Sequence, residues 1–278
     1  MSAPSEEWGE ESWLRRRLDQ PHVFAWASIG ALVLISWLLL AVMAVGETLS
    51  SGSYLAGIID AICSVDDNGW TAREFWLAVA MWLAMTCAMM LPAGAPMLAT
   101  YFDISGAAER KGMRIPGAHV LVSGYLLVWA GFACIAALGQ WALLNVEVLS
   151  PTLRLASPWV AGAVLIGAGA WQFSTTKHAC LTKCRRPFTW FMANWRDDFR
   201  GVFQMGLKQG VICVGCCWAL MLVMFVTGLM NLFWMAGLAV VMVAEKTIPN
   251  PKPLVYGTGV VLIVAGFAMF AGLVPVAR

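Results

Sequence analysis

Charged side chains are scarce in this sequence. Lys, Arg, Asp and Glu together make up 12% of the 278 residues, whereas hydrophobic residues make up 60%. A soluble domain is typically about 25% charged and about 45–50% apolar. The composition therefore excludes an ordinary soluble protein and indicates an integral membrane protein. The formal net charge of +2 gives no sign of a nucleic-acid partner, so the partner we expect first is the lipid bilayer.

Long linkers, low-complexity tracts and internal repeats are lacking too. The sequence also has no glycine-rich phosphate-binding loop and no Ser, His and Asp set for nucleophilic catalysis. We therefore expect an N-terminal interfacial segment (residues 1–22) followed by a single transmembrane domain (23–278). Whether the protein is an enzyme is left open, and a non-enzymatic role is favoured.

Apolar stretches are long enough to suggest seven membrane spans, since a span needs roughly 20 residues. The candidates cover residues 23–46, 75–99, 117–144, 158–176, 208–227, 230–246 and 254–273. With the N-terminus inside, 15 of the 18 Lys and Arg residues fall on the inner side, as the positive-inside rule requires. The predicted fold is an all-α, polytopic transmembrane helix bundle of about seven spans. An interfacial helix is predicted at 188–203.

Cysteine is concentrated in two groups. Cys213, Cys216 and Cys217 lie at i, i+3 and i+4 in CVGCCW, and a helix would place all three on one face. Cys180 and Cys184, in CLTKC, lie at i and i+4 just after the fourth predicted span. Both groups flank the same inner connection. We therefore expect a sulfur of the second group to lie within about 10 Å of the first, close enough for shared coordination after a small motion.

Methionines recur in the second predicted span. Met81, Met85 and Met89 lie four residues apart and would form one line along a helix. Pro92 and Pro96 follow them, and each removes a backbone hydrogen bond, so the helix should kink or unwind there. Such a kink is tolerated in a membrane where it lines a cavity or is buried in protein.

In the fifth predicted span, Met221 continues the line of the cysteine group. Thiolates and thioethers are the soft ligands that suit Cu(I). The candidate metal ligands are therefore Met81, Met85, Met89, Cys180, Cys184, Cys213, Cys216, Cys217 and Met221. They predict a membrane protein that binds, transports or delivers Cu(I), with a copper chaperone or a copper enzyme as its protein partner.

Two alternatives stay open. Cys180 with Cys184, and Cys213 with Cys216, could cycle between dithiol and disulfide in a redox carrier. Four of the cysteines could instead hold a structural Zn(II) ion that ties the fourth and fifth spans together. The redox carrier would need thiols at the oxidising outer face, where no pair is predicted. Zinc would leave the methionines unexplained.

Three sequence blocks resemble a known family. They are MWLAMTCAMMLPAGAPM (81–97), QFSTTKHACLTKCRRP (172–187) and MGLKQGVICVGCCWALMLVMFVTGLMNLFWM (205–235), with a trailing Glu245-Lys246. The chain resembles bacterial integral membrane proteins described as predicted metal-binding (domain of unknown function 2182), sometimes also called copper chaperones. The resemblance implies a metal site in the bacterial inner (cytoplasmic) membrane and no assigned reaction. These proteins often carry His where this chain has Gln209, so a His ligand is not expected there.

Overall fold

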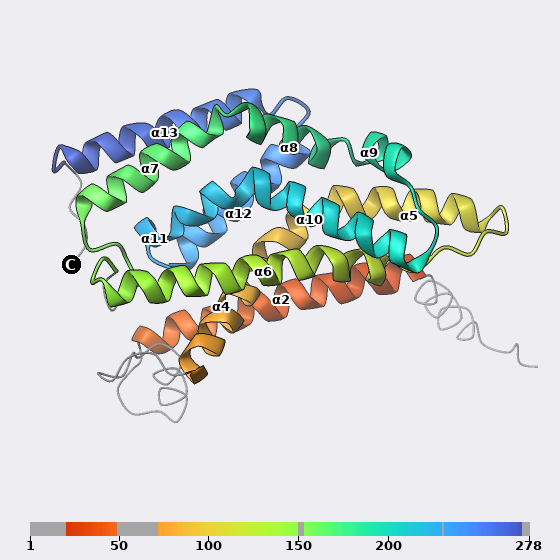
Figure 1. Ribbon diagram of the computed structural model, residues 1–278, viewed down its shortest axis with the longest axis horizontal. Coiled ribbons are helices and arrows are strands. Elements are labelled where there is room, and N and C mark those ends of the chain that lie inside the picture. The colour runs from red at the N-terminus through yellow and green to blue at the C-terminus, as the bar shows by residue number, and fades with distance from the viewer. Residues whose placement is uncertain (1–20, 49–71, 150–152, 230, 274–278) are drawn as a thin grey trace, which may run out of the picture.

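The computed structural model describes residues 21–48, 72–149, 153–229 and 231–273, and within these parts the chain is helical with no strand. This confirms the predicted all-α fold, and Figure 1 shows the helices arranged as a bundle. The helices are α2 (Pro21–Thr48), α4 (Ala72–Ala93), α5 (Ala95–Glu109), α6 (Ala118–Asn145), α7 (Pro158–Gln172), α8 (Thr175–Arg185), α9 (Pro187–Asn194), α10 (Phe199–Leu222), α11 (Met224–Thr227), α12 (Leu232–Thr247) and α13 (Lys252–Phe270).

Among the described residues, five helical stretches are long and apolar enough to cross a membrane: most of α2, all of α4, α6 and α13, and α10 together with α11. They coincide with five of the seven predicted spans. The other two predicted spans are helical but short, because α7 has 15 residues and α12 has 16. At 1.5 Å per residue these helices reach about 22 and 24 Å, less than the roughly 30 Å of a bilayer's hydrocarbon core.

Large apolar side chains are exposed on the outside of the bundle, while some charged side chains are buried inside it. Leu34 on α2, Ile135 on α6 and Val261 on α13 are 65%, 69% and 65% exposed. Lys177 and Glu245, by contrast, are 0% and 1% exposed. This distribution is unlike that of a soluble protein and fits a lipid environment. In a membrane, ionisable residues within the spans face the interior of the bundle.

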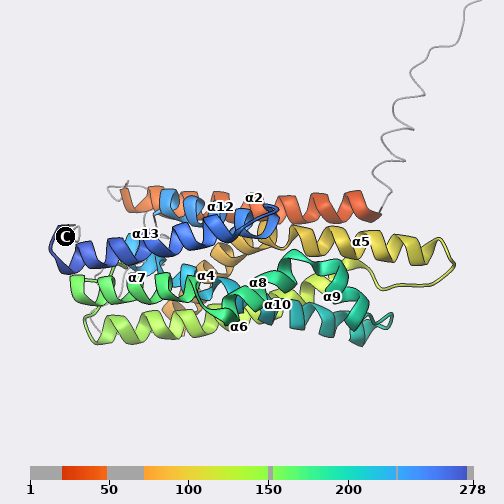
Figure 2. The ribbon, with the colours of Figure 1, turned by 90° about the horizontal axis from the view of Figure 1, so that it is seen from above.

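Glycines hold two helix pairs in close contact: α6 with α10, and α7 with α13 (Figures 1 and 2). A Cβ atom on Gly206 would lie 2.1 Å from the Leu121 carbonyl oxygen, and one on Gly266 would lie 2.7 Å from the Gly162 carbonyl oxygen. Real Cβ atoms essentially never come within 3.0 Å of such atoms. Small residues let the backbones of membrane helices approach this closely, so any larger side chain would force each pair apart.

The second predicted span breaks at its prolines, as expected. α4 ends and α5 begins on either side of Gly94. Pro92 cannot donate a hydrogen bond to the Ala88 carbonyl oxygen, and the Trp37 indole N–H donates to it instead, at 3.2 Å. A neighbouring helix thus satisfies the backbone group that the proline leaves free, which is the condition for such a break inside a membrane.

The single interfacial helix predicted at 188–203 is wrong. The segment is divided between α9 and the beginning of α10, with residues 195–198 between them. Asp198 causes the division, because its side chain accepts a hydrogen bond from the backbone N–H of Gly201 at 3.1 Å and so caps a new helix. The predicted N-terminal segment 1–22 lies outside the described residues, apart from the two that begin α2.

Candidate metal centre

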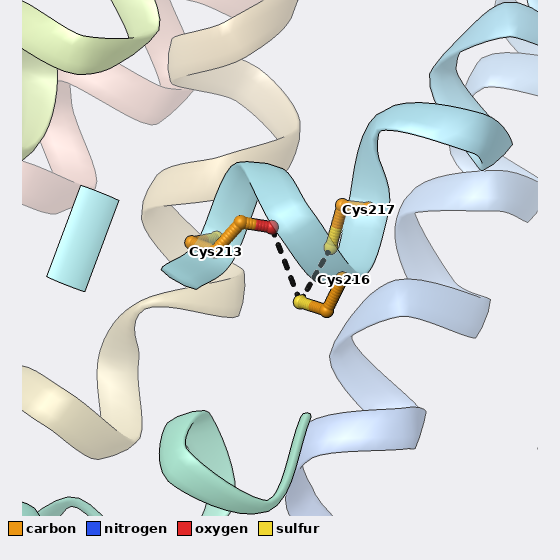
Figure 3. Close-up of side chains that lie close together, drawn as sticks. All are labelled: Cys213, Cys216 and Cys217. Atoms are coloured by element: carbon orange, nitrogen blue, oxygen red, sulfur yellow. Dashed lines mark hydrogen bonds between the residues drawn. The ribbon is translucent and has the colours of Figure 1, made fainter. Parts of the chain in front are cut away.

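Cys213, Cys216 and Cys217 come together on α10, as their spacing predicts. Their three Sγ atoms lie within 4.8 Å of one another, and all three residues are buried. Figure 3 shows the Cys216 sulfur between the Cys213 carbonyl oxygen and the Cys217 sulfur, at 3.1 Å and 3.3 Å. Two sulfurs bound to one ion at about 2.3 Å each can be at most about 4.6 Å apart. Three sulfurs that share one ion evenly at this distance lie about 4.0 Å apart, so the triad needs shifts of less than about 1 Å to share a metal ion.

Helix α8 brings a fourth thiol to this triad. Cys184 is buried, and its thiol interacts with the thiols of both Cys213 and Cys216. The hydrogen bond with Cys213 raises the pKa of the Cys184 thiol. The prediction that the two cysteine groups are neighbours is thus confirmed. Cys180, one turn earlier, is half-buried, and its Sγ lies 2.9 Å from the position that a Cβ of Gly215 would take. It therefore packs against the same stretch of α10.

A buried lysine contacts the triad from α12. Lys246 is 4% exposed, and its Nζ donates a hydrogen bond to the Cys213 sulfur at 2.9 Å. Tyr125 of α6 places its hydroxyl 3.1 Å from the same sulfur, and this hydroxyl also donates to the Met90 carbonyl oxygen at 2.9 Å. Burying an ammonium group is costly without a counter-charge. Cys213 is the group in contact with Lys246 that can supply this charge, as a thiolate.

The carboxylate next to Lys246 in the sequence is already paired. Glu245 accepts two hydrogen bonds from the Lys177 ammonium, at 2.8 Å and 3.1 Å, and both side chains are almost fully buried. This ion pair connects α12 to α8. Because Lys177 neutralises the charge of Glu245, the positive charge of Lys246 has to be balanced by the neighbouring thiols.

The predicted methionine ligands lie in the same core as the triad. Met85, Met89 and Met221 are 0% exposed, and Met81 is 4% exposed. Met221 lies one turn beyond Cys217 on α10, and the other three line one face of α4. Burial alone does not distinguish a ligand from core packing, which methionine also serves well. Their coordination of a metal remains a prediction.

Sequence reasoning missed the residues that surround the triad. Lys246 can be interpreted from the sequence as a helix end at the lipid headgroups, and Tyr125 carries no motif. A signal was present for Lys246, since an ionisable residue in an otherwise apolar stretch of a membrane protein is most often buried and functional. Nothing in the sequence indicates which sulfur it contacts.

A comparison with protein families identifies one that covers this site. The family model PpoB2, described as a copper chaperone, matches residues 79–269 and so includes all five clustered cysteines. The search of curated proteins and the search of solved structures found no match. The expected metal-binding family is thus supported, under a name other than domain of unknown function 2182. Because the match spans more than half of the chain, this protein belongs to the copper chaperone family PpoB2.

Proposed function

We propose that this protein binds Cu(I) within the membrane at Cys213, Cys216 and Cys217 and transports it or delivers it to another copper protein. The observation that carries the proposal is the buried triad, whose sulfurs lie within 4.8 Å of one another. The family description, copper chaperone, supports copper as the metal.

The charge of the site is compatible with Cu(I). Cu(I) bound by two thiolates of the triad, with the third cysteine as a thiol, has a net charge of about −1, and the ammonium of Lys246, in contact with Cys213, brings the buried site to neutrality. Zn(II) bound by all four neighbouring thiolates would leave the site at about −1 with Lys246 included, which is costly in an apolar interior. Zn(II) on three thiolates would be neutral as well, and the metal analysis described below distinguishes it from Cu(I).

The methionines extend the proposal beyond the triad. Met81, Met85, Met89 and Met221 are buried in the same core, and thioethers bind Cu(I) well but have little affinity for Zn(II). We propose that they form weaker copper sites along the ion's path. Cys180 and Cys184 on α8 would supply further thiols next to the triad. The partner would be a copper chaperone or a copper enzyme.

The membrane topology belongs to the proposal as well. We propose seven spans with the N-terminus inside, in the bacterial inner membrane, from the distribution of Lys and Arg. The short helices α7 and α12 would then cross where the bilayer is locally thinned, or together with the residues that flank them in the chain. Reporter fusions after Arg278 should read as external. A cytoplasmic reading would contradict the seven-span arrangement.

Metal analysis of the purified, reduced protein tests the function. Wild type should hold copper stoichiometrically, and Cys216→Ser with Cys217→Ser should lose it. Met85→Leu with Met89→Leu should weaken copper binding but keep the fold, because Leu conserves volume and costs less than about 1.5 kcal/mol. Met192→Leu is the matched control, since Met192 lies half-exposed on α9.

The alternatives predict different results. Stoichiometric zinc that is indifferent to the Met85 and Met89 substitutions would overturn the copper assignment. Negligible metal, together with thiols that can be trapped in oxidised and reduced forms, would favour the redox carrier instead.

A further inference from the structure

Cys184 lies beside the triad without being part of it. It comes from α8, whereas the triad is on α10. It interacts with Cys213 and Cys216, yet only the three α10 sulfurs lie mutually within 4.8 Å. Cys184 is 9% exposed, while Cys213, Cys216 and Cys217 are 2%, 1% and 0% exposed. Of these four residues it is therefore the most exposed.

The surface next to Cys184 is positively charged. The segment 173–196 contains five basic residues and no acidic residue. Lys177 is paired with Glu245, and Arg185 donates hydrogen bonds to the carbonyl oxygens of the loop after α12. Lys183 and Arg186 are exposed, one residue before and two residues after Cys184. Two exposed positive charges therefore flank Cys184 in the sequence.

The unit formed by Cu(I) and two thiolate sulfurs carries a net charge of about −1, whichever molecule supplies the thiolates. We propose that Cys184 is the thiol that exchanges copper with such an anionic Cu(I)–bis-thiolate complex, and that Lys183 and Arg186 attract the complex. This inference rests on the proposed function, because it presumes that the triad holds Cu(I). It adds the chemical class of the copper donor and the place where copper enters.

The exchange is balanced without any redox change. The Cys184 sulfur forms a bond to Cu(I), one donor thiolate leaves, and the proton of the Cys184 thiol passes to that leaving thiolate. Cu(I) remains monovalent throughout. Cys213, as the thiolate beside Lys246, then displaces the second donor thiolate, which leaves as an anion. Cys216, a neighbour of Cys184, displaces the Cys184 sulfur, and Cys184 takes up the proton that the Cys216 thiol loses. Ligand exchange in such steps needs only that donor and acceptor sulfurs reach one ion together.

Stopped-flow transfer to the full-length, metal-free protein in detergent tests this role. The donor is Cu(I) bound by glutathione, whose complex is anionic. Cys184→Ser should slow uptake about tenfold or more, because the first acceptor sulfur is gone, and its copper affinity at equilibrium is measured separately. Cys134→Ser is the matched control, since Cys134 is a half-buried cysteine on α6 outside the thiol group.

Charge reversal tests the attraction. Lys183→Glu with Arg186→Glu should slow uptake from glutathione about tenfold at low salt, with the effect shrinking as salt screens the charges. The same variant should speed uptake from Cu(I) bound by cysteamine, whose complex is cationic. Lys111→Glu, an exposed lysine in the loop after α5, should change neither rate. A Cu(I)-loaded acidic protein with two cysteines serves as a second donor. If the rate of copper uptake saturates as the concentration of this donor rises, the donor is a protein that docks rather than a small thiol.

The outcomes separate this inference from the function on which it rests. Wild type that binds no Cu(I) would overturn the proposed function. Wild type that binds Cu(I) while Cys184→Ser takes it up at the normal rate would overturn only the inference. Loss of equilibrium copper affinity in Cys184→Ser would make Cys184 a resting ligand and would also overturn the exchange role.

Discussion

The ion pair between Lys177 and Glu245 offers a test of how this bundle is held together. The Nζ to Oε2 distance is 2.8 Å, and the two side chains are 0% and 1% exposed. Lys177→Met leaves the Glu245 carboxylate buried and without its partner, and Glu245→Leu does the same to the ammonium. Removing one member of a buried pair typically costs about 3–5 kcal/mol. We expect each single variant to lose about this much free energy of unfolding.

The double variant should recover most of that loss. Lys177→Met with Glu245→Leu removes both charges, so neither desolvated ion remains, and replacing a whole buried pair by apolar side chains is often neutral or stabilising. We expect its free energy of unfolding to lie within about 1.5 kcal/mol of wild type. The two substitutions should therefore be far from additive, as residues in direct contact generally are.

Unfolding in mixed micelles of mild detergent and dodecyl sulfate, followed by tryptophan fluorescence, measures these free energies. Lys252→Met is the matched control, because Lys252 is an exposed lysine at the start of α13 and its loss should change stability by less than about 0.5 kcal/mol. Single variants that cost less than about 1 kcal/mol, or a double variant that costs the sum of the two, would refute the reasoning.

Three further predictions follow from contacts described above. Lys246→Met should lower Cu(I) affinity about tenfold or more, and Lys246→Arg should restore most of it, because the cation beside Cys213 balances the metal–thiolate charge; competition with a Cu(I) chelator measures this, and equal losses in both variants would contradict it. Gly206→Ala should destabilise the bundle by about 1–3 kcal/mol, since its Cβ would lie 2.1 Å from the Leu121 carbonyl oxygen; an unchanged unfolding midpoint would disprove the close contact. Trp37→Phe should cost about 1–3 kcal/mol by leaving a buried carbonyl on α4 unpaired, and a stability equal to wild type in the same unfolding assay would show that this hydrogen bond is dispensable.

What the sequence reveals here is set by short-range geometry. The spacing of Cys213, Cys216 and Cys217 is enough to place them on one face, because a helix fixes the direction of residues three and four apart. Pro92 is enough to predict the break in the second span, because the missing N–H is a property of that residue alone. The neighbouring positions of the two cysteine groups follow from their placement at the same inner side of two successive predicted spans.

Contacts between distant segments were beyond the same reasoning. Lys246 and Cys213 are 33 residues apart, and Lys177 and Glu245 are 68 apart. Which way a lysine at a helix end points depends on how that helix packs, and the sequence pattern of α12 does not contain this information. The single helix predicted at 188–203 is wrong for a local reason instead. The apolar periodicity of this segment continues through Asp198, but the aspartate caps a new helix there.

The two glycine-packed helix pairs, with α8 attached to one of them, each contribute sulfurs to the thiol group. α8 follows α7 after only two residues, so Cys184 is attached to the α7–α13 pair, whereas Cys213 belongs to the α6–α10 pair. During the proposed exchange, a copper ion shared by both sulfurs would join the two helix pairs for as long as the transfer lasts. The passage of copper to the triad would therefore depend on how closely the α7–α13 and α6–α10 pairs approach each other.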